Sequence, residues 1–106
     1  MSDDDIEARV DLMARVFIAR LPVRFEKMQE AFALCRASPQ APENWLELHR
    51  LLHSLAGAAG TFGCDGLGVQ ASRIEQRITD LLALPERTHN HVEEIGHALA
   101  GLQAAA

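Results

Sequence analysis

Hydrophobic residues recur along the chain at the alternating spacing of three and four residues that is typical of helices in a bundle. The clearest stripe lies between Trp45 and Gly63. A helix turns about 100° per residue, which collects seven apolar side chains on one side: Leu48, Leu51, Leu52, Leu55, Ala58, Ala59 and Phe62. The pattern predicts a long helix with one face turned toward a core.

The opposite face of this helix carries a histidine among small residues. Its members are Leu46, His49, His53, Ala56, Gly57 and Gly60. The last three follow His53 by three, four and seven residues, so they form a lane of small side chains beside it. Each glycine costs a helix about 1 kcal/mol relative to alanine, and packing on the core side gives no reason for that cost. We therefore expect an imidazole that is accessible to an approaching partner.

Two helices are predicted before this segment. Ser2 precedes three aspartates, which is typical of an N-cap followed by a favourable acidic first turn. The first stripe consists of Ile6, Val10, Met13 and Phe17, and the second of Leu21, Phe25, Met28, Phe32 and Cys35. The second helix is expected over about 21–37, and the SPQAP segment at 38–42 is a turn signal.

Two more helices are predicted after the histidine helix. Gly63 is a plausible C-cap for the histidine helix, and Asp65 can cap a fourth helix over about 66–84. A fifth helix begins at Thr88 or Asn90, where Asn90 with Glu93 resembles a capping box. No segment alternates with period two, and the loops are short. The chain is therefore predicted to be all-α: an antiparallel up-and-down four-helix bundle with an additional N-terminal helix packed over one end.

Size and composition indicate a single domain over residues 1–106. The net charge is −5, and the ten Lys and Arg residues are scattered, with few aromatic residues, so nucleic acid is not expected as a partner. No apolar run approaches the length of a membrane span, and the acidic start lacks a signal-peptide pattern. Cys35 and Cys64 form no CxxC pair. These features favour a protein of the reducing cytoplasm.

The histidines do not form a convincing metal site. His49 and His53 have the i, i+4 spacing of two ligands, but the HExxH motif requires Glu where Arg50 stands. A cation beside a divalent metal is unfavourable, and bundle metal ligands point inward whereas these two point outward. The other histidines lie near no matching acidic cluster: His89, His91 and His97. No metal site is expected.

Known catalytic motifs are also missing from the sequence. Ser54 neighbours His53, but adjacent residues on a helix point about 100° apart. The chain contains no GxSxG elbow, P-loop or dinucleotide-binding fingerprint. We therefore do not expect an enzyme with its own substrate pocket. What remains is a single exposed imidazole, and a neutral imidazole nitrogen is a competent nucleophile at physiological pH.

The segment HSLAGAAGTFG, from His53 to Gly63, resembles the signature of histidine-containing phosphotransfer (HPt) domains of bacterial phosphorelays. That signature is a histidine, any residue, leucine, usually lysine, glycine, then small residues and a second glycine. The matching positions are His53, Leu55, Gly57 and Gly63, with Leu67 and Glu75 where the family tends to have Leu and Glu on the next helix. The FIARLPVRFEKMQEAF segment is similar to the family's preceding helix.

The resemblance implies a phosphorelay intermediate without kinase catalysis. His53 would accept a phosphoryl group from the phospho-aspartate of a receiver domain and pass it to another receiver domain. The partners would be response regulator receivers, including those of hybrid histidine kinases, and Mg²⁺ would belong to the partner, with no cofactor in this chain. A monomer is expected. The docking surface would include Leu46, His49, Arg50, Ala56, Gly57 and Gly60.

One position departs from the family pattern. The usual lysine three residues after the histidine is Ala56 here. Arg50, one turn before His53, could supply a cation for the phosphoryl group, or it could be a solvated surface side chain. The missing lysine also supports an alternative function: a helical protein-binding module that uses the same face of His53, Gly57 and Gly60 without being phosphorylated.

Overall fold

The computed structural model describes residues 2–106, and this part of the chain contains five α-helices and no strand. Their bounds are α1 (Asp3–Ala19), α2 (Leu21–Ala37), α3 (Pro42–Thr61), α4 (Asp65–Leu82) and α5 (His89–Ala104). The all-helical prediction is confirmed. None of these helices is both long enough and apolar enough to cross a membrane.

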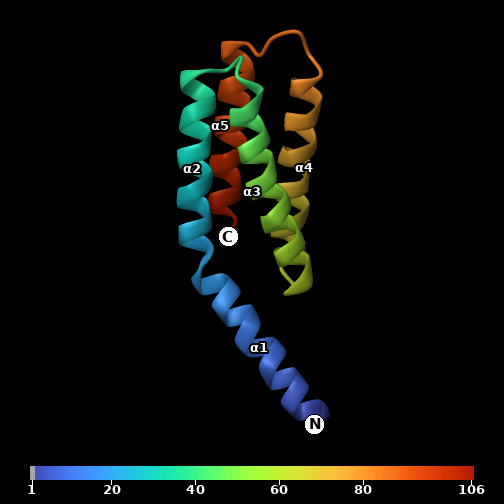
Figure 1. The fold of residues 1–106 in the computed structure, drawn as a ribbon. Coiled ribbons are helices and arrows are strands. Elements are labelled where there is room, and N and C mark those ends of the chain that lie inside the picture. Colours follow the sequence, from blue (N-terminus) through green and yellow to red (C-terminus); the bar gives the residue numbers. More distant parts are fainter. Residues whose placement is uncertain (1) are drawn as a thin grey trace.

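Helices α2 to α5 lie side by side around one apolar core (Figure 1). Contacts join α2 with α3, α3 with α4, α4 with α5, and α5 with α2. The predicted stripe of α3 supplies Leu48, Leu52, Leu55 and Ala59 to this core. Trp45 is fully buried as well, and its indole N–H donates a 2.7 Å hydrogen bond to the carbonyl oxygen of Pro39.

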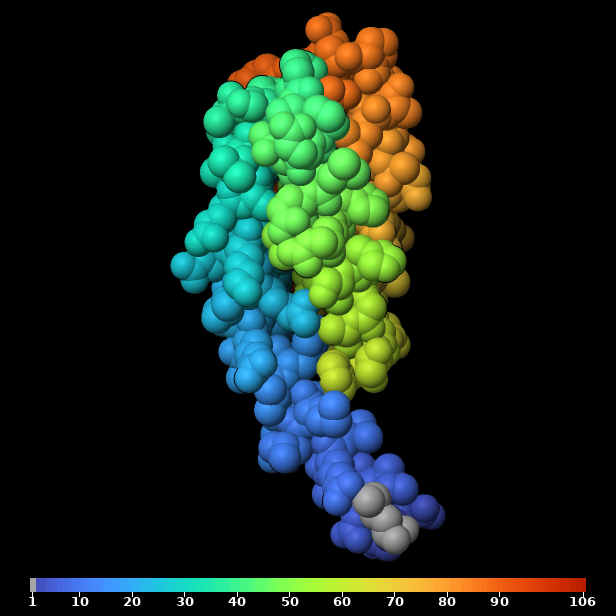
Figure 2. Space-filling model, viewed as in Figure 1, coloured from blue at the N-terminus to red at the C-terminus, as the bar shows by residue number. Residues whose placement is uncertain are grey.

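Helix α1 projects away from the other four helices (Figures 1 and 2). Phe17 is its only buried residue, and the Phe17 ring packs against Phe62 with the ring centroids 5.5 Å apart. The expectation that this helix packs over one end of the bundle is therefore wrong for most of its length. Only Arg20 separates α1 from α2, and antiparallel helices need a loop of about two to five residues to reverse the chain.

The start of α1 follows its sequence signal, and α3 ends one residue from its predicted cap. The backbone N–H of Asp5 donates to Ser2 Oγ at 3.3 Å, which confirms the predicted N-cap. The C-cap of α3 is Phe62 rather than the predicted Gly63. Gly63 follows it with a φ of +80°, in the left-handed region that a residue other than glycine rarely adopts. Asp65 is not the cap of α4, because it is already the first helical residue and Cys64 occupies the N-cap position.

Of the two predicted starts of α5, Thr88 and Asn90, the structure has Thr88. Thr88 is the N-cap: its hydroxyl accepts from the backbone N–H of His91 at 3.2 Å. The Thr88 backbone N–H in turn donates to His91 Nδ1 at 3.0 Å, which completes a capping box. The predicted box of Asn90 and Glu93 is wrong, because Glu93 instead forms an ion pair with Arg36 of α2.

A buried arginine joins the two loops at the end of the molecule opposite α1. Arg87 is 8% exposed, and its guanidinium donates to the carbonyl oxygens of Pro39 at 3.2 Å and Leu84 at 3.1 Å. The side chain of Gln40 pairs with both backbone groups of Arg87, at 2.8 and 2.9 Å. These contacts satisfy carbonyl groups at the helix ends and connect the α2–α3 and α4–α5 loops.

Helices α3 and α4 approach each other closely near Gly68. A Cβ atom at this position would lie 3.3 Å from the backbone oxygen of Ala56 and 3.5 Å from the Cβ of Ala59. Small residues on both helices therefore permit the close approach. It sets the α4 residues that follow Gly68 beside the histidine face of α3.

Candidate functional site

The candidate site is the outer surface of α3 around His53. The His53 side chain is 76% exposed, and its Nδ1 lies 2.7 Å from Oε1 of Glu75 on α4. The Glu75 side chain is only 18% exposed, because it lies between the two helices. The imidazole is thus open to solvent on one side and held by a carboxylate on the other.

This hydrogen bond determines which nitrogen of His53 is free. A carboxylate oxygen can only accept, so the proton of a neutral His53 lies on Nδ1 and the lone pair lies on Nε2. Among the described residues, no side chain or backbone group is hydrogen-bonded to Nε2. Nε2 is therefore the nitrogen whose lone pair is free of any partner within the described residues.

The His49 ring is hydrogen-bonded to α4 and lies beside the Glu75 carboxylate. Its Nε2 lies 3.1 Å from Thr79 Oγ1 and 3.6 Å from Glu75 Oε1. The Thr79 hydroxyl donates to the Glu75 backbone oxygen at 3.2 Å, so its oxygen accepts the proton from His49 Nε2. His49 was predicted as a docking residue, but the structure directs its ring toward α4.

The other predicted docking residues differ in accessibility. Leu46 is 55% exposed, whereas Ala56 is half-buried and packs against the core. A Cβ atom added at Gly57 or Gly60 would meet no atom within 4 Å. The packing of the chain therefore does not require glycine at these two positions. Because neither carries a side chain, the helix backbone beside His53 is accessible.

Arg50 is occupied by a neighbouring carboxylate. Its guanidinium donates two hydrogen bonds to Glu47, at 2.9 and 2.6 Å. This pairing raises the pKa of Arg50 and lowers the pKa of Glu47, chiefly through the hydrogen bonds between the two side chains. The positive charge of Arg50 is thus largely balanced within α3, which weakens the case that it replaces the missing lysine.

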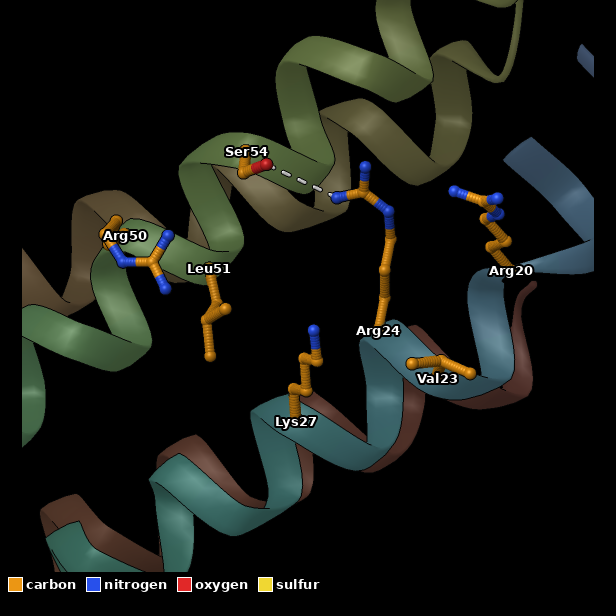
Figure 3. A pocket seen from close by; sticks show the side chains of 7 residues that line it. All are labelled: Arg20, Val23, Arg24, Lys27, Arg50, Leu51 and Ser54. Carbon is orange, nitrogen blue, oxygen red and sulfur yellow. Dashed lines mark hydrogen bonds between the residues drawn. The ribbon is translucent and has the colours of Figure 1, made fainter. Parts of the chain in front are cut away.

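Sequence reasoning missed a basic groove on the other flank of the His53 helix. This α2–α3 groove has a volume of about 480 Å³ and is lined by Arg20, Val23, Arg24, Lys27, Arg50, Leu51 and Ser54 (Figure 3). Arg24 reaches across it and donates to Ser54 Oγ at 3.3 Å, directly beside His53 in the sequence. Arg20, directly before α2, and the α2 residues Arg24 and Lys27 follow the four-three spacing of a helix face. That spacing was the available signal.

Glu75 was also absent from the predicted site residues, although it falls at the family's glutamate position. The helix that carries it was predicted correctly, but periodicity does not tell which α4 side chain reaches His53. Within residues 2–106, no three histidine, cysteine or carboxylate side chains are grouped so that they could hold a metal ion.

One of three comparisons with known proteins gives a match. The family model of the Hpt domain matches residues 12–105. The chain therefore belongs to the Hpt domain family, whose members have a histidine phosphotransfer role in phosphorelays and interact with receiver domains of response regulators or hybrid kinases. Searches of curated proteins and of solved structures find no match.

Proposed function

We propose that His53 is the phosphoacceptor of this protein, which takes a phosphoryl group from the phospho-aspartate of one receiver domain and relays it to a second. The observation that carries this proposal is the arrangement of the imidazole: Nδ1 is bound to Glu75 at 2.7 Å, and Nε2 is exposed on a surface without bulky neighbours. That arrangement suits a nucleophile that must meet a group carried by another protein.

The phosphoryl transfer needs no group that takes a proton from His53. The Nε2 lone pair attacks the phosphorus in line, and the P–O bond to the receiver aspartate breaks with its electron pair leaving on the carboxylate. The imidazole keeps its proton on Nδ1, where Glu75 accepts the hydrogen bond and balances the charge that develops on the ring. Transfer to a second receiver is the same displacement in reverse.

The surroundings of His53 suit a receiver domain as partner. Gly57 and Gly60 allow a close approach of another backbone, and the exposed Leu46 adds apolar surface suited to a transient complex. Mg²⁺ and a lysine of the receiver would stabilise the moving phosphoryl group, so this chain needs no cofactor of its own.

The cations of the α2–α3 groove are the better replacement for the lysine missing at Ala56. Arg24 is hydrogen-bonded to the neutral Ser54, whereas Arg50 is paired with the carboxylate of Glu47. Charges in this groove attract the acidic active-site face of a receiver. Arg24→Ala should therefore slow transfer, most strongly at low salt, while Arg50→Ala changes the rate less. Equal rates for Arg24→Ala and wild type would contradict this assignment.

The central test is phosphotransfer from a radiolabelled phospho-receiver. Wild type should acquire acid-labile, base-stable phosphate, and His53→Ala should acquire none. His97→Ala, which removes an exposed histidine of α5, is the matched control and should behave as wild type. Binding of the receiver without any transfer would instead identify the alternative, a non-phosphorylated binding module. Undiminished transfer to His53→Ala would refute the proposal.

A further inference from the structure

Helix α1 displays an apolar surface that the bundle does not cover. Its large hydrophobic residues are between 43% and 60% exposed: Ile6, Val10, Leu12, Met13, Val16 and Ile18. In Figures 1 and 2 this helix projects beyond the other four helices. A concentration of exposed apolar side chains on one projecting element is typical of a protein–protein contact.

The residues of α1 continue one heptad pattern over the whole helix. The pattern consists of Asp3, Ile6, Val10, Met13 and Phe17, with Arg20 at its C-cap, at spacings of three, four, three, four and three. These are the a and d positions of a coiled coil. The stripe begins with an acidic residue and ends with a basic one.

This stripe is complementary to itself in one orientation. In an antiparallel pair, a positions face d positions of the partner helix. One register, centred between residues 11 and 12, then places Asp3 opposite Arg20 and Val10 opposite Met13. Ile6 falls opposite Phe17, which its own bundle already buries against Phe62. A parallel pair would instead set the acidic ends, Asp3 to Asp5, against each other.

The base of α1 provides a recess for the end of a second helix. A groove of about 320 Å³ lies there, lined by Leu12, Met13, Val16, Phe17, Arg20, Arg24 and Phe62. In the antiparallel register, Ile6 of a second copy lies over the apolar part of this groove. Asp3 of the second copy then lies opposite Arg20, so an acidic residue meets a basic one beside the apolar contact.

We propose that this protein forms a symmetric dimer through antiparallel pairing of α1 with α1 of a second copy. The same patch is used by both copies, as a two-fold interface requires. This dimer replaces the monomer expected from the sequence. It also leaves His53 free, because His53 precedes Phe62 by nine residues of α3, which is roughly 13 Å along the helix axis.

Sedimentation equilibrium on the full chain, over a concentration series, tests the dimer. The expected mass is twice that of the chain at high concentration, and Met13→Glu should weaken association by at least about tenfold. Leu34→Glu is the matched control, because Leu34 is 56% exposed on α2, outside α1, and its replacement should leave association unchanged. Trp45 fluorescence would show that both variants keep the folded core.

A charge exchange tests the orientation. Asp3→Lys and Arg20→Glu should each weaken the dimer, and the double variant should restore it, because the opposite charges face each other again. A monomer at every concentration, or a dimer insensitive to Met13→Glu, would overturn the proposal. Failure of the double variant to restore association would overturn the antiparallel register. None of these results depends on phosphotransfer, so failure of the dimer and failure of the proposed function are distinguishable.

Discussion

Replacing Gly57 with alanine should stabilise the protein and slow phosphotransfer at the same time. Gly57 lies inside α3, and a Cβ atom added there would meet no atom within 4 Å. The substitution therefore adds the helix preference of alanine over glycine, about 0.8–1.0 kcal/mol, without a steric penalty. For a domain of this size, that gain raises the Tm by about 4 °C.

The functional effect has the opposite sign because the methyl group lies one turn from His53, on the surface where the receiver backbone would approach. We expect transfer to slow by about tenfold, which corresponds to about 1.4 kcal/mol of the barrier. Urea unfolding followed by the fluorescence of the buried Trp45 measures stability, and transfer from a phospho-receiver measures the rate. A destabilised Gly57→Ala, or one with an unchanged transfer rate, would refute the reasoning.

Gly68→Ala is the matched control for the stability measurement. It is the same substitution in the neighbouring helix, but its Cβ would lie 3.3 Å from the backbone oxygen of Ala56 and 3.5 Å from the Cβ of Ala59. Overpacking of this kind costs about 1–3 kcal/mol. The cost exceeds or cancels the gain in helix preference, so Gly68→Ala should not be more stable than wild type.

Three further outcomes are expected. Glu75→Ala should slow transfer and shift the imidazole proton of His53 away from Nδ1, and an unchanged ¹⁵N tautomer signature would contradict the positioning role of Glu75. Arg87→Ala should lower the free energy of unfolding by about 3 kcal/mol in urea, because buried carbonyl groups lose a charged donor; a change below about 0.5 kcal/mol would contradict it. Burial raises the pKa of the Cys35 thiol from 9.0 to about 12, so at pH 8 a thiol reagent should label the half-exposed Cys64 first and Cys35 only on unfolding. Between pH 9 and 12 the Cys35 thiol of the unfolded chain loses its proton, while that of the folded chain keeps it. The free energy of unfolding should therefore fall over that range. Cys35→Ala should not show this fall.

Local signals in the sequence were sufficient for the helices and for the exposed position of His53. The three-four spacing of apolar residues and the end signals at Ser2 and Gly63 depend on neighbours within one or two turns, and the structure agrees with them. The exposure of His53 was predicted in the same way, because Gly57 and Gly60 are costly residues in a helix and the core does not explain them. Where end signals competed, as for Thr88 and Asn90, local rules left two alternatives.

Contacts between helices were decided only by the tertiary structure. Helical periodicity places Glu75 on a face of α4, but the close approach of α3 and α4 at Gly68 brings that carboxylate within 2.7 Å of His53. The basic groove likewise combines cations from α2 and α3, and Arg50 is hydrogen-bonded to Glu47. The direction of α1 depends on the single residue that separates it from α2. These features arise from distances between segments far apart in the chain, which a one-dimensional pattern does not contain.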